Sequence, residues 1–180
     1  AILIKEYTYQ VVSIFPIKNN KNEVSFTYDE NESTVTLELT DKVIDQYQLH
    51  QGAIIDRDTF NTLKDLEQIS RAYNKALKYL SVKDYTEQQM RKKLMNSGDY
   101  DDAQLDATIQ LLSEKNLIND HLFTLNYFKR CTRLGIGHNK AIYNLRSYGV
   151  DSETLNKIIK YKENIMELVA ESDENLLNKY

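Results

Sequence analysis

The most specific candidate for chemistry is a glycine-rich turn, Leu134-Gly135-Ile136-Gly137-His138-Asn139-Lys140-Ala141. Two glycines around an apolar residue let the backbone approach another surface closely. The helix expected after the turn begins with free N–H groups and a partial positive charge, and both attract anions. The same glycines would also let two packed helices reverse direction sharply, so a purely structural role stays open.

Catalytic constellations are absent from the sequence. There is no Gly-x-x-x-x-Gly-Lys loop, which excludes a P-loop nucleotide hydrolase. His50, His121 and His138 lack zinc-ligand spacing, and one cysteine excludes every multi-cysteine zinc site. Cys131 lies between two of these histidines, but its apolar neighbours favour a small core residue over a nucleophile. We therefore predict no enzyme, no metal and no cofactor.

Basic residues gather in two stretches that could hold an anionic partner. We predict partner contacts from Arg91, Lys92, Lys93, Arg130, Arg133, Lys140 and Arg146. Phosphate binding needs mobile cations of this kind but no bidentate geometry. The same cations could bind an acidic protein groove equally well. Several of the 13 tyrosines interleave with these cations. They could stack on bases, although interface packing is their commoner use. A solvated helical surface is the plain alternative.

The charge is distributed unevenly along the 180 residues. Residues 1–68 hold 6 basic and 12 acidic groups, residues 69–148 hold 13 and 8, and residues 149–180 hold 4 and 7, which sums to the net charge of -4. A basic middle between acidic flanks attracts an anionic partner locally. A single cysteine fits a reducing compartment. No apolar run is long enough to cross a bilayer and no apolar leader opens the chain, so we expect a cytoplasmic protein without membrane contact.

The first forty residues alternate as strands do. We predict strands at Ile2–Ile17, Glu23–Tyr28 and Thr34–Leu39, joined by polar turns. The first strand places one set of side chains on a single face: Tyr7, Tyr9, Val11, Ser13 and Phe15. Three antiparallel strands are marginal alone, so the meander should pack against a helix.

The remainder has helical spacing. A short helix is expected at 41–47, capped by Thr40 or Asp41, and a long helix should begin near Asp56 or Asp58, either continuous or in two pieces.

The helical part also repeats: residues 90–98 align with 141–149, and Leu105 and Ile109 align with Leu155 and Ile159. Helices are expected at 72–81, 86–97 and 101–116, and again at 119–134, 138–148 and 151–170. In each repeat a glycine, Gly98 or Gly149, is predicted to adopt the left-handed conformation just after the middle helix. An aspartate, Asp101 or Asp151, is predicted to be the N-cap of the third helix.

These patterns predict a mainly α fold with a small N-terminal β part (α+β). A three-stranded antiparallel meander precedes tandem three-helix repeats, each of which buries its apolar face against its neighbours. The predicted domains are a β-rich extension with a short helix (1–57), a first repeat with its leading helix (58–118), a second repeat (119–171) and the start of a third (172–180). Asp173–Leu177 matches the opening of the second repeat, so we expect the natural protein to continue. A frayed C-terminal helix is the alternative.

The order and spacing of several segments resemble the RecX family. The segments are Ala76–Leu80, Tyr85–Leu94, Leu111–Phe123 and Gly135–Val150, and the resemblance covers roughly residues 69–155. The strand-rich start is similar to the N-terminal extension of the longer RecX members of low-GC Gram-positive bacteria.

The resemblance implies a negative regulator of the RecA recombinase. RecX proteins are built of tandem three-helix units, usually three, so the resemblance implies an elongated, curved arrangement of the repeats. RecX proteins bind in the groove of the RecA–DNA filament. They inhibit its extension, strand exchange, ATP hydrolysis and coprotease activity, and so modulate recombination, DNA repair and the SOS response. The expected partner is the RecA filament, with weak contact to single-stranded DNA, and the chain is expected to be a monomer.

A competing prediction is a direct DNA-binding module. The Gly135-Ile136-Gly137 turn is similar to the hairpin of helix-hairpin-helix modules, which hold phosphates through backbone amides. Such a module would bind DNA without RecA, whereas the regulator would bind naked DNA weakly.

Overall fold

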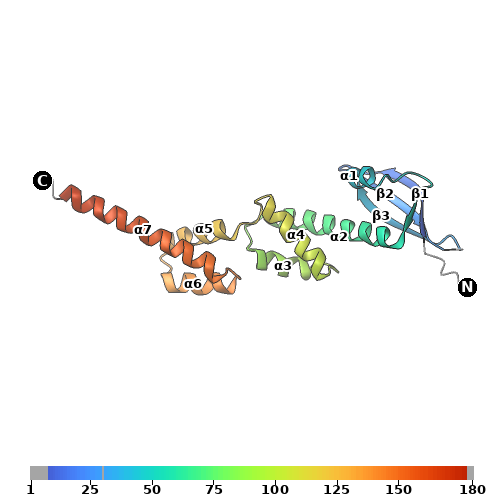
Figure 1. The fold of residues 1–180 in the computed structure, drawn as a ribbon. Helices are drawn as coiled ribbons and strands as arrows, with labels where there is room; N and C mark the ends of the chain where they lie inside the picture. Colours follow the sequence, from blue (N-terminus) through green and yellow to red (C-terminus); the bar gives the residue numbers. More distant parts are fainter. Residues whose placement is uncertain (1–7, 30, 178–180) are drawn as a thin grey trace, which may run out of the picture. The chain divides into compact units, whose positions relative to one another are not determined.

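The computed structural model describes residues 8–29 and 31–177, with side chains described as far as residue 171. This part of the chain is mainly helical, with a small antiparallel sheet on its N-terminal side (Figure 1). The predicted fold class is therefore confirmed. The chain divides into two compact units, Ala1–Ala72 and Tyr73–Tyr180. The predicted start of the first strand, residues 2–7, lies outside the described residues.

The sheet has four strands, one more than the sequence indicated. Strands β1 (Thr8–Pro16), β2 (Lys21–Thr27) and β3 (Thr34–Thr40) form the predicted meander. The fourth strand, β4 (Ile54–Asp56), pairs antiparallel with the start of β1, which gives the order β3-β2-β1-β4. A strand of three residues is too short to show alternation, so its pattern was not visible in the sequence.

A bulge in β1 changes which side chains of that strand face the core, so the predicted alternation holds only before the bulge. The pairing with β2 shifts between Val11 and Ser13, so one extra residue enters β1 and reverses which side chains face inward. Val11 is buried and Tyr9 stacks on Phe60 with ring centroids 3.9 Å apart, as expected for an inward face. Beyond the bulge Ile14 packs on the core and Phe15 is 63% exposed, so the prediction that Phe15 shares the face of Val11 is wrong.

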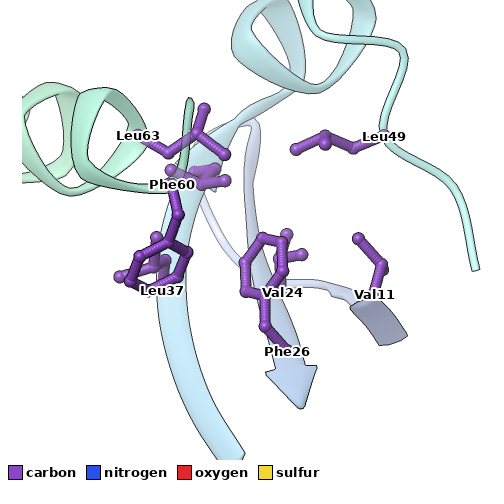
Figure 2. Close-up of a cluster of buried hydrophobic side chains, with 8 residues drawn as sticks. Val11, Val24, Phe26, Leu37, Leu49, Phe60 and Leu63 are labelled. Carbon is purple, nitrogen blue, oxygen red and sulfur yellow. The ribbon is translucent and has the colours of Figure 1, made fainter. Parts of the chain in front are cut away.

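The core of the first unit joins this sheet to a helix. Val24 and Phe26 of β2 and Leu37 of β3 face the first turns of α2 (Arg57–Leu80), from which Phe60 and Leu63 project (Figure 2). Burying such a side chain contributes about 1.5–3 kcal/mol, enough to stabilise strands that are marginal alone.

Both helices of this region begin where the sequence predicts. Helix α1 (Asp41–Gln46) starts after Thr40, whose hydroxyl accepts the Val43 N–H at 3.3 Å. Helix α2 runs unbroken for 24 residues, and the Asp56 carboxylate accepts the Thr59 N–H at 2.7 Å at its start. These side chains satisfy amide groups that a helix leaves without a partner in its first turn.

Five further helices follow, close to the predicted positions. They are α3 (Glu87–Met95), α4 (Asp102–Glu114), α5 (Asp120–Arg133), α6 (His138–Ser147) and α7 (Ser152–Leu177). Asp101 caps α4 by accepting the Gln104 N–H at 2.7 Å, and Asp151 caps α7 by accepting the Thr154 N–H at 2.6 Å, as predicted. Helix α7 extends seven residues beyond its expected end at residue 170.

Of the two glycines predicted to end the middle helices, only one adopts the left-handed conformation. Gly149 follows the cap residue of α6 with φ +85°. The prediction for Gly98 is wrong: α3 ends at Met95 with Asn96 as its C-cap, and Gly98 is not among the residues with positive φ. A Cβ at Gly98 would come within 3.0 Å of the Tyr100 ring, so this glycine makes room for a side chain instead.

Gly149→Ala should destabilise the second unit more than Gly135→Ala. Both glycines have positive φ, which costs an alanine about 1–2 kcal/mol. A Cβ at Gly135 meets nothing within 4 Å, whereas one at Gly149 overlaps the Gln88 side chain. Urea unfolding followed by circular dichroism measures both costs. Equal losses of stability would show that the Gln88 contact does not constrain residue 149.

Candidate partner-binding surface

The seven cations predicted to bind a partner lie on three helices of the second unit, and Arg91, Arg130 and Arg133 line three different pockets. Arg91 has its guanidinium held by the Asp106 carboxylate and lies 3.4 Å from that of Asp102, so much of its charge is neutralised within the protein. Because Asp102 and Asp106 belong to α4, this pair joins α3 to α4. Arg91 is therefore the least available of the seven.

The other predicted cations are exposed. Lys92 and Lys93 lie in the last turn of α3, and the Lys93 ammonium is 5.1 Å from the centre of the Tyr79 ring. Arg130 and Arg133 of α5 line two different grooves, Arg130 with Tyr127 and Tyr148, and Arg133 with residues of α7.

Lys140 and Arg146 are exposed at the two ends of α6. Exposed cations of this kind can attract phosphate or carboxylate groups.

The glycine-rich turn closes one helix and opens the next. Gly135 has φ +69° and donates its N–H to the Thr132 carbonyl at 3.3 Å, while Ile136 donates to the Cys131 carbonyl at 2.9 Å. This is a glycine C-cap that satisfies carbonyls left free at the end of α5. Ile136 packs on the core beside Cys131, which is buried as predicted. Gly137 begins α6 without a side-chain cap.

The contact that joins the two repeats centres on Thr86, which the sequence analysis did not single out. The residue is fully buried, its hydroxyl accepts the Gln89 N–H at 3.1 Å, and the same hydroxyl donates to the Tyr148 carbonyl at 2.5 Å. The Gln89 side chain in turn accepts the Thr86 N–H at 3.1 Å. The Thr-x-x-Gln spacing marks a capping box and was visible in the sequence, but the bond to residue 148 was not.

A carboxylate makes the second bond across this junction. Asp120, at the start of α5, accepts the Glu87 N–H at the start of α3 at 2.9 Å. Burial raises the pKa of Asp120, the hydrogen bond from Glu87 lowers it in part, and the charges of Glu87 and Asp151 raise it further. The net direction is upward because water is partly excluded and other carboxylates lie close.

Neither a group of metal ligands nor a membrane-spanning helix is found among the described residues. Within residues 8–29 and 31–171, whose side chains are described, no three His, Cys, Asp or Glu side chains lie together as metal ligands would. In the same part of the chain no helix combines the length and apolarity needed to cross a membrane.

Comparison with known proteins finds a family model and several relatives that are similar to this chain. Residues 72–112 match a family model described as RecX, first three-helix domain. The regulatory protein RecX of Clostridioides difficile (strain 630) is 25% identical over 143 residues, which cover 79% of this chain and 65% of that protein. The regulatory protein RecX of Clostridium beijerinckii is 28% identical over 165 residues, covering 89% of this chain and 75% of that protein. The chain thus spans slightly less than two thirds of the length of the first relative.

A solved structure has the same fold. The crystal structure of a regulatory protein RecX matches with a TM-score of 0.67 at 20% identity, covering 85% of this chain and 73% of that chain. The fold and the Thr86 junction define the class, in which a small antiparallel sheet is followed along the chain by three-helix units in tandem. The family model and the relatives then show that the chain is similar to regulatory proteins of the RecX family.

Asp120→Asn should be at least as stable as the wild type at neutral pH. The amide oxygen can still accept the Glu87 N–H, and the buried charge is gone. The raised pKa means that folding favours protonated Asp120, so the wild type gains stability as pH falls through the folded pKa. The advantage of the variant should therefore shrink in acid, as measured by thermal unfolding across a pH series.

Asp151→Asn is the matched control, because the contribution of Asp151 to stability changes with pH in the opposite direction. Hydrogen bonds from Thr154 lower the pKa of Asp151, so its stabilising contribution is present at neutral pH and is lost as pH falls through the folded pKa. An Asp120→Asn variant less stable than the wild type at neutral pH would show that the charge of Asp120 strengthens the junction.

Proposed function

We propose that this chain is a negative regulator of the RecA recombinase in the cytoplasm. It binds the RecA–DNA filament and inhibits filament extension, strand exchange, ATP hydrolysis and coprotease activity, and so modulates recombination, DNA repair and the SOS response. The observation that carries the proposal is the similarity to RecX regulatory proteins over 143 and 165 residues, together with the matched first three-helix domain.

Inhibition of this kind requires binding but no catalytic group. A filament that exchanges subunits populates growing and dissociating states, and a ligand shifts that balance by as much as its affinity for the two states differs. A non-enzymatic regulator is therefore sufficient, and exposed cations on helices are suitable groups for an acidic protein surface or for bound DNA.

The exposed predicted cations are the proposed contacts. Lys92 and Lys93 form an adjacent pair on α3, and Arg130, Arg133, Lys140 and Arg146 extend the positive charge over α5 and α6. Arg91 is proposed to contribute less, because its guanidinium is paired with Asp102 and Asp106.

The double variant Lys92→Glu/Lys93→Glu should weaken inhibition of RecA several-fold at near-physiological salt. Two attractive charges become repulsive, while the Arg91 pair that joins α3 to α4 stays intact. The measurement is single-stranded-DNA-dependent ATP hydrolysis by the cognate RecA, titrated with wild-type and variant chains. The wild type should inhibit below one chain per RecA.

Lys42→Glu/Lys64→Glu is the matched control, because it makes the same charge change at two exposed lysines of the first unit. It should inhibit as the wild type does. Equal inhibition by all three proteins would exclude Lys92 and Lys93 as contacts. If the wild type fails to inhibit, the proposed function itself is contradicted for this chain.

A further inference from the structure

A groove of about 840 Å³ lies between α5 and α7, and the proposed function uses only Arg133 of its lining. We call it the α5–α7 groove. Apolar and aromatic side chains of both helices line it: Leu125, Phe128, Tyr161, Ile165 and Met166. Two further cations, Lys129 and Lys162, line it as well, and no carboxylate of the described residues does. An apolar groove with cations in its lining suits a helix that carries an apolar face and acidic side chains.

Helix α7 buries apolar residues in its first turns and exposes them further along. Leu155 and Ile158 are buried in the core of the second repeat, whereas every residue from 163 to 171 is exposed. Ile165 and Val169 follow Ile158 by about two and three helical turns, so they continue the face that packs into the core. Val169 is 56% exposed, and Met166 beside Ile165 is 70% exposed. An apolar helix face that is open to water is typical of a surface that another molecule covers.

The charge of α7 changes sign along the helix. Residues 157–162 hold three lysines and no acidic residue, and residues 163–171 hold three glutamates and no basic residue. The Lys162 ammonium lies 4.5 Å from the centre of the Phe128 ring, which places it beside the apolar lining of the α5–α7 groove. The exposed stretch 163–171 therefore has the chemistry that the groove fits, an apolar face with acidic side chains.

We propose that two copies of this chain form an antiparallel dimer, in which residues 163–171 of each α7 dock in the α5–α7 groove of the other copy. The same patch is used on both copies, so each contact forms twice. The antiparallel direction places the acidic part of one α7 opposite the basic part of the other, and the helix dipoles also oppose each other. A parallel pair would bring like charges together. The dimer differs from the monomer that the sequence analysis expects.

A second copy accounts for both exposed features of this region. An acidic helix of an unrelated protein would fill the α5–α7 groove but would leave Val169, which is not part of the groove lining, exposed to water. In the antiparallel pair, Val169 of each copy is buried in the groove of the other. Burying a valine side chain contributes about 1.5–3 kcal/mol, and the symmetry supplies that contribution twice. This association is a property of the chain alone and does not depend on action on RecA.

The test uses the full chain without RecA, and sedimentation equilibrium over a concentration series measures its mass. The wild type should rise from the monomer mass of 21.1 kDa towards twice that value. Val169→Glu should weaken the dimer at least about tenfold, because it places a charge in an apolar contact at two symmetric positions. Val82→Glu is the matched control, since it makes the same change at a valine that is 82% exposed and lies outside α7. It should dimerise as the wild type does.

Charge reversal tests the direction of the pairing. Lys129→Glu and Glu163→Lys/Glu167→Lys should each weaken the dimer, because each places like charges across the interface. A chain that carries all three changes should recover part of the lost affinity, since opposite charges then face each other again. Met166→Cys should form a disulfide-linked dimer under a mild oxidant, because residue 166 lies near the two-fold axis of the antiparallel pair. Val82→Cys is the control, and the native Cys131 is buried.

Three results would overturn the proposal. A wild type that stays monomeric at every concentration would leave the α5–α7 groove to a different occupant, such as an acidic helix of another protein. Equal losses in Val169→Glu and Val82→Glu would place the dimer contact elsewhere, and so would equal disulfide linkage of Met166→Cys and Val82→Cys. Circular dichroism checks the fold of each variant, and the linkage of Met166→Cys decides the question even if Val169→Glu unfolds. Because RecA is absent, a negative result here leaves the inhibition of RecA untouched.

Discussion

One buried hydroxyl connects the two helical repeats of this protein. The Thr86 side chain caps α3 through the Gln89 N–H and donates its own hydrogen to the carbonyl of Tyr148, 62 residues further along the chain. A buried polar group left without its partner costs about 1–3 kcal/mol, so the cap of α3 and the end of α6 stabilise each other. Gly149 follows directly, and its missing Cβ admits the Gln88 side chain of α3.

Two pockets at the junction between the repeats differ in charge. Four carboxylates and Arg91 line one pocket, while another is lined by the rings of Tyr127 and Tyr148 and the cations of Lys83 and Arg130. Both arrangements present groups that attract or repel a charged partner. This agrees with the regulatory character of the RecX family and with a mechanism in which binding energy alone shifts the state of a partner. The bond that holds the repeats together thus also positions the surfaces proposed to bind.

Local features of this fold could be predicted from sequence, and features that depend on distant contacts could not. The helices, the caps at Asp101 and Asp151 and the left-handed Gly149 follow from rules acting within a few residues. The bulge after Val11 was missed because it arises from pairing with β2, and β4 was missed because only its partner β1 makes it a strand. The same limit applies to the candidate contacts: seven cations were counted as equivalent, yet Arg91 is paired with α4 and Arg130 and Arg133 line different grooves.

The central claim is that the cation-bearing helices of the second unit contact the RecA filament. Hydrogen–deuterium exchange of the chain, alone and with RecA assembled on single-stranded DNA, tests this most directly. We predict slower exchange in the filament-bound chain over α3, α5 and the start of α6, with the sheet strands β1 to β3 unchanged. Unchanged exchange throughout, or protection confined to the sheet, would contradict the claim.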